Sequence, residues 1–449
     1  MKLRLLTLVA TLATILCVSA TSPAEGWWKG MLMQRLPLVI HITASPSDPQ
    51  QLAAMVYSPM QTADSFPAAR VEFADSLLTL SLPALNASFS GRLTEDPAID
   101  GTFIQGMQLP LRLTPGSPDD ILPARPQTPQ PPFLYLTEDI TFLTPDSITV
   151  GGTIAAPFTR PAGALVLVSG SGAQNRDEEI YRHKPFAVIA DYLARMGWAT
   201  LRCDDRGVGS TSPGRPDDTT ITYAGDAMAA VGELRRRFPG IPVGILGHSE
   251  GGTIALYNAA RHPDEIDLAI SLAGMAINGR DLMIRQNEML AEHAGQPQSP
   301  ESHALMVKVF DAIREPGTPA QVAARIDSLY ARIEPDSTRR APTVAAMSTP
   351  WYIGFIRLDP SQWLADIKAP VLAIAGSWDL QVEAEPNLRA IADALPQART
   401  ELLPDLNHML QESPSRQQSF GYATITQTIS PLALRTIASF LTDFTRSRK

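Results

Sequence analysis

The stretch Gly244–Leu256, GILGHSEGGTIAL, places a serine between glycines where one sequence pattern gives way to another. Before it, residues 241–246 (IPVGIL) form an apolar run typical of a strand buried on both faces of a parallel sheet. After it, residues 251–260 contain no proline and have the pattern of a helix. A tight strand-to-helix turn of the form G-x-S-x-G lifts a serine hydroxyl above the sheet, where it can act as a nucleophile. Because the short pattern also arises by chance, the prediction for Ser249 depends on partners elsewhere in the chain.

Composition and charge limit the classes of function for this 449-residue chain. The length is sufficient for two or three domains with a substantial core. The net charge of −9 offers no basic surface for nucleic acid, so no such partner is expected. Of the two cysteines, Cys17 lies in a predicted leader, which leaves Cys203 alone. No intramolecular disulfide is therefore expected, and Cys203 is predicted to pack as a small core residue.

Residues 1–20 have the pattern of a secretory signal peptide. Lys2 and Arg4 precede the apolar run Leu5–Val18, and small residues follow it. The run is too short for a comfortable membrane span. We therefore expect cleavage after Ala20 or Ala24 and export to the periplasm or the medium. No other segment is long and apolar enough to cross a membrane, so no transmembrane segment is expected in the mature chain.

The rest of the chain is predicted to form two domains joined by a proline-rich segment. Residues 25–114 contain short alternating segments separated by turn residues, the pattern of a small all-β barrel or sandwich. Residues 115–132 include seven prolines, which predicts an extended linker. Residues 133–449 alternate strand-like and helix-like segments, which is typical of a mostly parallel sheet covered on both faces. From about 278 to 349 the stretch is mostly helical and predicts a lid over the site, with an ordinary packing insertion as the alternative.

A serine nucleophile needs a base that takes its proton and a third group that orients the base. His408 follows a strand-like segment late in the chain, at the expected carboxyl edge of the sheet. His248 adjoins the serine and should point elsewhere on a tight turn. Asp379, just past another buried strand, is the predicted acid, whereas Asp405 has the context of a turn residue. The order Ser249, Asp379, His408 is one of the chain orders known for such triads.

Two backbone N–H groups should complete the site by binding the oxyanion. The turn supplies the N–H of Glu250, the residue after the nucleophile. The second donor should lie in the small-residue loop after the strand-like segment 164–168, and Ser171 or Gly172 is predicted. A phosphate-binding loop is the rival interpretation of these glycines, but the lysine of such a loop is missing.

Residues 133–449 resemble the α/β-hydrolase superfamily, in the branch of secreted bacterial carboxylesterases described as serine aminopeptidase-like. The resemblance implies the α/β-hydrolase fold, with Ser249 as nucleophile, Asp379 as acid and His408 as base. The family usually has proline, glutamine and aspartate where residues 173–175 stand, which puts a side-chain role there in doubt. The N-terminal segment resembles small β-barrel domains that precede such hydrolases. The segments that carry the hydrolase resemblance are LVSGSGAQNRDE, HKPFAVIADYLARMG, LRCDDRGVGS, GHSEGG, SWDLQV and NHML.

These features predict a serine hydrolase that acts on small carboxylic esters through an acyl-enzyme intermediate. No metal or organic cofactor is expected, since histidine and cysteine spacing shows no zinc pattern. A serine aminopeptidase or amidase is the alternative enzyme. A ligand-binding protein with a vestigial hydrolase domain is the alternative from another class, and an intact triad argues against it.

Overall fold

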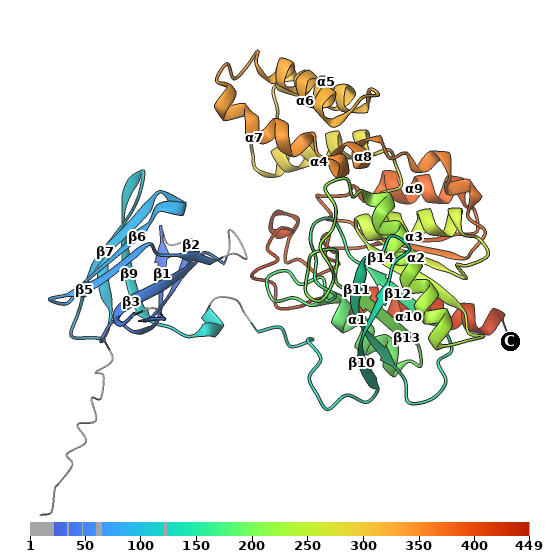
Figure 1. Cartoon of the computed structure of the whole chain (residues 1–449), viewed down its shortest axis with the longest axis horizontal. Coiled ribbons are helices and arrows are strands. Elements are labelled where there is room, and N and C mark those ends of the chain that lie inside the picture. Colours follow the sequence, from blue (N-terminus) through green and yellow to red (C-terminus); the bar gives the residue numbers. More distant parts are fainter. Residues whose placement is uncertain (1–21, 34–35, 47, 60–64, 121–123, 449) are drawn as a thin grey trace, which may run out of the picture. The chain divides into compact units, whose positions relative to one another are not determined.

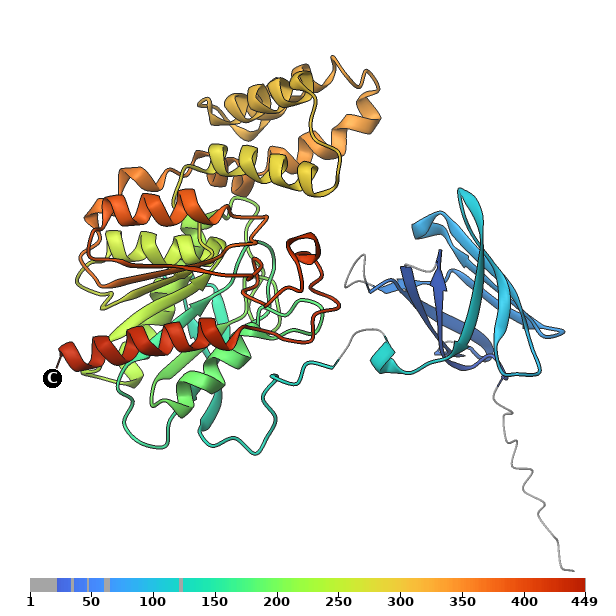
Figure 2. The same cartoon turned by 180° about the vertical axis from the view of Figure 1, so that it is seen from behind.

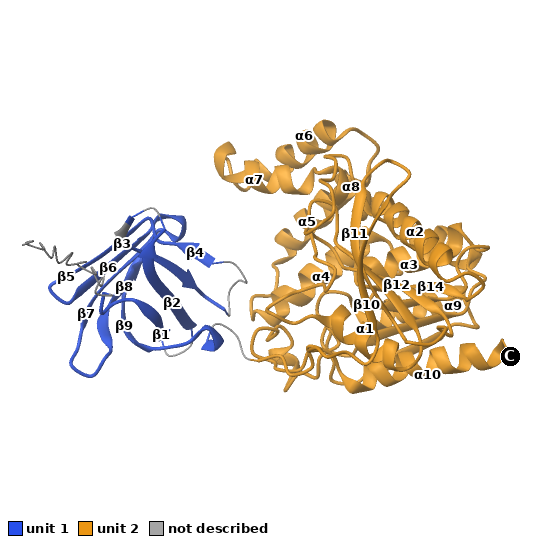
Figure 3. Cartoon of the chain, turned by 60° about the horizontal axis from the view of Figure 1, so that its bottom comes forward, with its two compact units in different colours: residues 1–122 blue, residues 123–449 orange. Residues whose placement is uncertain are grey.

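The computed structural model describes residues 22–33, 36–46, 48–59, 65–120 and 124–448. The chain divides into two compact units, between residues 122 and 123 (Figure 3). The predicted signal peptide lies outside the described residues. Within the described ranges, no helix has both the length and the apolar character needed to cross a membrane.

The first unit is one antiparallel sheet, in the order β4-β3-β2-β1-β9-β8-β7-β6-β5. The segment between β4 and β5 joins its two ends. Ala68 N donates to Ala54 O on β3, and Ala69 N donates to Ser81 O on β6. The sheet therefore curls into a half-barrel around an apolar core, and the predicted all-β domain is confirmed. Its strands are β1 (Gly26–Leu32), β2 (Leu36–Ser45), β3 (Asp48–Tyr57), β4 (Ser65–Pro67), β5 (Arg70–Ala74), β6 (Leu77–Leu82), β7 (Ala87–Leu93), β8 (Ile99–Gln105) and β9 (Met107–Pro115).

The second unit contains a sheet in the order β10-β11-β13-β12-β14-β15-β16-β17. The pairs β10–β11 and β11–β13 are antiparallel, and all the later pairs are parallel. Strand β14 lies between β12 and β15, so the residue after it leaves from the middle of the carboxyl edge. The strands are β10 (Leu136–Leu143), β11 (Thr149–Ala156), β12 (Ala164–Val168), β13 (Ala199–Cys203), β14 (Val243–His248), β15 (Ala269–Leu272), β16 (Val371–Gly376) and β17 (Arg399–Leu403).

Helices cover both faces of this sheet (Figures 1 and 2). On one face, α1 (Pro185–Arg195) and α10 (Pro431–Ser447) bury apolar side chains such as Leu193 and Leu441 against the strands. On the other, α2 (Thr220–Arg237), α3 (Glu250–Arg261) and α9 (Ala384–Ala394) do the same. The mostly parallel, doubly covered sheet is therefore confirmed. Its central strands are apolar without alternation because both of their faces are buried.

A helical insertion separates β15 from β16 and has an apolar core of its own (Figure 1). It continues past residue 349, where the sequence pattern placed its end. Pro350 does not stop it, because proline fits the first turn of a helix and Thr349 caps that turn by accepting from Tyr352 N. The insertion consists of α4 (Gly279–His293), α5 (Pro300–Arg314), α6 (Pro319–Tyr330), α7 (Ser337–Met347) and α8 (Pro350–Arg357).

Residues 124–132, within the predicted linker, belong to the second unit and pack against the rest of it. The Arg125 side chain is buried and donates to the carbonyls of Tyr181, Ala423 and Ile425. Gln127 donates to Ile429 O through its amide nitrogen. These bonds attach this part of the linker to loops near α1 and α10.

Candidate active site

Ser249 stands on a tight turn between β14 and α3. Its backbone has φ 54° and ψ −121°, which is unusual for a residue other than glycine. The turn needs glycine around it: a Cβ on Gly247 would lie 1.9 Å from Gly251 O, and one on Gly251 would lie 2.0 Å from Val168 O. The strained serine and the close glycines together have the geometry of a nucleophile elbow, at the carboxyl edge of the sheet.

Asp379 and His408 come together on the loops after β16 and β17. His408 Nδ1 lies 2.7 Å from Asp379 Oδ2, and both side chains are almost fully buried. The other carboxylate oxygen of Asp379 accepts from the backbone N–H groups of Gln381 and Val382, at 2.8 and 2.9 Å. These bonds hold the carboxylate in one orientation. Nδ1 of His408 is thereby occupied, which leaves Nε2 for a proton from another group.

In the described part of the chain, no hydrogen bond or ion pair joins Asp405 to His408. Asp405 is exposed, has a positive φ of 60°, and its backbone N donates to Ser377 Oγ. The structure thus places Asp405 in a turn and Asp379 on the imidazole. Ser249 and His408 line the same cavity, of about 290 Å³. Among the described residues, no hydrogen bond joins Ser249 to His408, as is common before a substrate is bound.

The loop after β12 lies against Ser249. A Cβ on Gly170 would lie 3.1 Å from Ser249 Cβ, so this is a close approach. The N–H of Gly170 already donates to Glu178 Oε1 at 2.7 Å. Ser171 and Gly172 are both exposed, but only Ser171 is among the described residues that line the cavity. Glu250 begins α3, where first-turn N–H groups have no acceptor within the helix.

The Glu250 side chain connects the elbow to the helical insertion. Its Oε1 accepts from Thr220 Oγ1 at 2.6 Å and from Trp351 Nε1 on α8 at 2.9 Å. Trp351, Tyr352 and Phe355 of α8 also line the cavity. These contacts could not be predicted from the sequence, because no local pattern connects a helix of the insertion to the turn that it covers.

Glu178 and His248 form a second buried pair beside Asp379 and His408. His248 Nδ1 lies 2.9 Å from Glu178 Oε1, and His248 Nε2 lies 2.9 Å from the carbonyl oxygen of His408. Burial lowers the pKa of His248, but the Glu178 carboxylate and the His408 carbonyl outweigh it and raise that pKa to about 8. The His248 side chain lines the same cavity as Ser249 and His408, and the sequence did not signal its hydrogen-bond partners.

A loop after β13 supports the loop beside Ser249. Asp205 accepts from Ser169 Oγ at 3.1 Å and from Gln174 N at 2.9 Å. Burial raises the pKa of the Asp205 carboxyl to about 7. Asp204 accepts from the backbone N and the guanidinium of Arg176. The two aspartates thus hold residues 169–176 in place through these hydrogen bonds.

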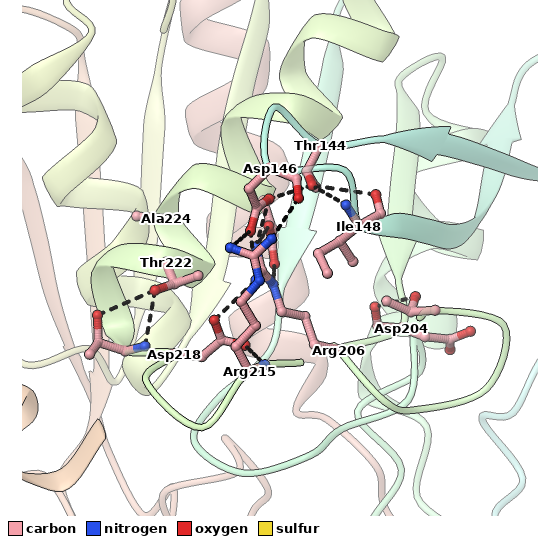
Figure 4. Close-up of polar contacts among 12 residues, drawn as sticks. Thr144, Asp146, Ile148, Asp204, Arg206, Arg215, Asp218, Thr222 and Ala224 are labelled. Carbon is pink, nitrogen blue, oxygen red and sulfur yellow. Dashed lines mark hydrogen bonds and ion pairs between the residues drawn. The ribbon is translucent and has the colours of Figure 1, made fainter. Parts of the chain in front are cut away.

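Arg206 anchors that supporting loop in turn. Its side chain is 3% exposed and forms ion pairs of 2.7 to 3.0 Å with Asp146, Asp218 and Asp226. Figure 4 shows its guanidinium among these polar groups, with Asp146 and Asp218 labelled. The three carboxylates come from the β10–β11 turn, the loop after β13 and α2. They fasten three separate segments to one arginine.

The cavity is mostly apolar, with a few polar groups. Helix α4 contributes Leu282, Met283 and Gln286, and other polar groups come from Gln174, Gln381 and Tyr422. Across the described residues, no cluster of histidine, cysteine and acidic side chains could hold a metal ion. Burial raises the pKa of the Cys203 thiol well above its usual range, which makes the thiolate nucleophile unfavourable there.

The family model for the serine aminopeptidases, S33 (Hydrolase_4), matches residues 161–414, more than half of the chain. The chain belongs to this family. The resemblance to α/β-hydrolases and the fold class are therefore confirmed, and the protein is a member of a serine hydrolase family. The matched range includes Ser249, Asp379 and His408.

Two solved structures illustrate the similarity of this family member to known hydrolases. An esterase from Pyrococcus furiosus is 15% identical, covers 69% of this chain and 93% of its own, and has a TM-score of 0.42. A proline iminopeptidase from Mycobacterium smegmatis is 19% identical, covers 70% of this chain and 100% of its own, and has a TM-score of 0.43. Similarity at this level does not choose between an ester and a peptide substrate.

Proposed function

We propose that this family member is an exported serine carboxylesterase with Ser249, His408 and Asp379 as its triad. The observation that carries the proposal is the elbow serine opening onto the same cavity as an imidazole whose Nδ1 is bound to a buried carboxylate. His408 Nε2 takes the proton of Ser249 Oγ as the oxygen attacks the ester carbonyl. Asp379 holds the tautomer and stabilises the imidazolium that forms.

The tetrahedral intermediate carries its charge on the former carbonyl oxygen. Backbone N–H groups of Glu250 and Ser171 bind that oxygen in this proposal. Ser171 is favoured over Gly172 because it lines the cavity, and the N–H of Gly170 is already used by Glu178. The alcohol leaves with the proton from His408, and water then repeats the sequence on the acyl-enzyme.

The charge of the cavity favours an ester over the substrate of an aminopeptidase. An aminopeptidase must bind a protonated α-amino group, and a buried ammonium needs a carboxylate partner. Glu178 is the one carboxylate among the described residues that line the cavity, and it already faces His248. A neutral ester with a small apolar acyl group fits a cavity of about 290 Å³ better, since this volume is near the lower end for ligand sites, about 300 Å³.

Export rests on the leader-like pattern of residues 1–20. In the structure Ala24 is buried, and its carbonyl accepts from Trp28 Nε1 at 2.8 Å. Cleavage after Ala20 keeps this contact and cleavage after Ala24 removes it, so we propose the former. N-terminal sequencing of the exported protein tests this.

A panel of chromogenic esters and aminoacyl anilides tests the reaction, with and without a serine-directed phosphonate. We expect turnover of short-chain esters, little turnover of anilides, and phosphonate labelling of Ser249. Faster cleavage of anilides than of matched esters would instead establish the aminopeptidase. Binding of esters without turnover or labelling would favour a vestigial hydrolase.

A further inference from the structure

We propose that Glu178 and charged His248 are positioning residues that hold the His408 loop in register with the loop beside Ser249. This inference rests on the proposed function, because it concerns how the triad is kept aligned. Neither residue is assigned a contact with the reacting atoms. Their role is to connect segments that are far apart in the sequence.

The connection runs through three hydrogen bonds. Glu178 Oε1 accepts from Gly170 N at 2.7 Å and from His248 Nδ1 at 2.9 Å. His248 Nε2 donates to His408 O at 2.9 Å. The loop against Ser249, the end of β14 and the loop that carries the base are therefore joined in one chain of contacts.

The geometry of His248 requires two protons on its ring. Both ring nitrogens face oxygen atoms that can only accept, a carboxylate and a backbone carbonyl. A neutral imidazole has one N–H and can satisfy only one of them. On losing its charge, His248 must release either Glu178 or the peptide carbonyl of His408.

The surroundings leave little else to compensate this charge. The side chains of His248 and Glu178 are 8% and 6% exposed. Glu178 Oε2 is buried and has no hydrogen-bond partner among the described residues. The small void beside the pair is lined by Glu178 and His248 themselves and otherwise by apolar side chains: Pro185, Phe186, Ile189, Leu272, Leu410 and Ile429, with Met409.

Few other titratable groups act on this pair. Asp379 and His408 face His248 from the loops after β16 and β17. Asp205 acts on Glu178 from the loop after β13. Because the pKa of His248 is about 8, its charge is lost above neutral pH, and the link to His408 weakens there. His248 is charged below its pKa, so the link is intact there, and it is lost as the pH rises above the pKa.

The experiment compares kcat and KM for a soluble ester from pH 5.5 to 9.5 in the full-length protein and in Glu178→Gln. Glutamine keeps the shape and an accepting oxygen but removes the charge, so the pKa of His248 should fall at least to its ordinary value of about 6.5. We expect the alkaline limb of kcat to move down by more than one pH unit. At pH 8 kcat should fall about fifteenfold and recover toward pH 6, with KM changed less than about twofold, since a shift from pKa 8 to 6.5 lowers the charged fraction at pH 8 by about that factor.

Three further variants separate the inference from a merely structural role. Glu179→Gln is the matched control, because Glu179 is adjacent but pairs with Lys184 at the surface, and it should keep the wild-type profile. Asp205→Asn should keep the alkaline limb of the kcat profile at the same pH. That result would exclude the titration of Asp205 as the cause of the limb. His248→Gln should lower kcat and abolish the limb, and it keeps the test valid if Glu178→Gln does not fold.

The ring nitrogens of His248, followed by NMR in histidine-labelled protein and assigned with His248→Gln, give a readout independent of activity. We expect titration near pH 8 in the wild type and at least one unit lower in Glu178→Gln. Unchanged titration and an unchanged kcat profile in Glu178→Gln would overturn the inference while leaving the esterase intact. If the wild type hydrolyses no ester, the proposed function fails, and the ring titration still decides whether Glu178 keeps His248 charged.

Discussion

The Asp379–His408 pair and the Arg206 cluster are two groups of buried ionisable side chains at the same edge of one sheet. His408 has one carboxylate partner and lines the cavity. Arg206 has three carboxylate partners and is absent from the described lining of the cavity. In the proposed function the Asp379–His408 pair takes part in the chemistry, whereas the Arg206 cluster anchors loops. The difference lies in the groups themselves, because an imidazole can take up and release a proton, whereas a guanidinium stays protonated.

The largest expected effect concerns Ser249, which lines the same cavity as His408. Ser249→Ala should reduce kcat for a soluble ester by a factor on the order of 10⁶, because a triad without its nucleophile retains only binding and oxyanion stabilisation. The melting temperature should be unchanged or slightly higher, since alanine replaces a partly buried hydroxyl. A variant that keeps a tenth of the wild-type kcat would show that Ser249 is not the nucleophile.

The next prediction asks which carboxylate serves His408. Asp379→Asn presents an amide to Nδ1 and favours the wrong tautomer, so kcat should fall by around 10⁴. Asp405→Asn is the matched control. Asp405 is exposed in a turn, and asparagine makes similar local hydrogen bonds there, so kcat should fall by about tenfold or less. Both are measured at pH 7, and an equal or larger loss for Asp405→Asn would mean that the acid has been misassigned.

Substitution of Arg206, the centre of the other cluster, should reduce stability and leave the hydrolytic activity nearly unchanged. Arg206→Met leaves Asp146, Asp218 and Asp226 without their shared cation, and breaking a buried ion pair costs about 3 kcal/mol or more of unfolding free energy. Folded protein should keep kcat within a few-fold. Urea unfolding and kcat at pH 7 measure the two quantities.

Arg215→Met is the control for this variant. Arg215 is 52% exposed, lies 3.5 Å from the Asp146 carboxylate and donates to the Asp146 carbonyl at 2.8 Å in an exposed contact, so its loss should change the unfolding free energy by less than about 1 kcal/mol. If Arg206→Met abolished kcat in fully folded protein, the cluster would belong to the catalytic apparatus and the comparison would not hold.

The smallest expected effect concerns the first unit. A chain that begins at Ala124 should hydrolyse a small soluble ester within several-fold of the full-length rate, since no proposed catalytic residue precedes it. A chain that begins at Phe133 should have the same kcat but lower stability, because it lacks the buried Arg125 and Gln127. Inactivity of a folded chain from Ala124 would assign the first unit a part in the site.

Much of the fold could be predicted from short-range patterns. The alternation in residues 25–114 and the apolar runs before Ser249 and Asp379 report whether one face or both faces of a strand are buried, and this is a local property. Helices were predictable by the same reasoning. The end of the insertion was not, because Pro350 has the appearance of a stop signal but occupies the first turn of α8, where its missing N–H costs nothing.

The three proposed triad residues were found from the sequence because each follows a strand, and parallel strands bring their carboxyl ends to one edge. The sequence predicted Asp379 rather than Asp405 as the partner of His408, but the contact itself is seen only in the tertiary structure, in which Asp379 is buried on the ring and Asp405 faces solvent. The link from Glu178 through His248 to the His408 carbonyl was also beyond the sequence. It joins residues 70 and 160 positions apart, and no periodicity records such a distance. The sequence by itself determined the elements and the order of the reactive groups, since both follow from local burial and chain direction. The partner of each buried charge was set by the tertiary structure. A buried charge needs a partner, and which residue supplies it depends on how the loops pack against one another.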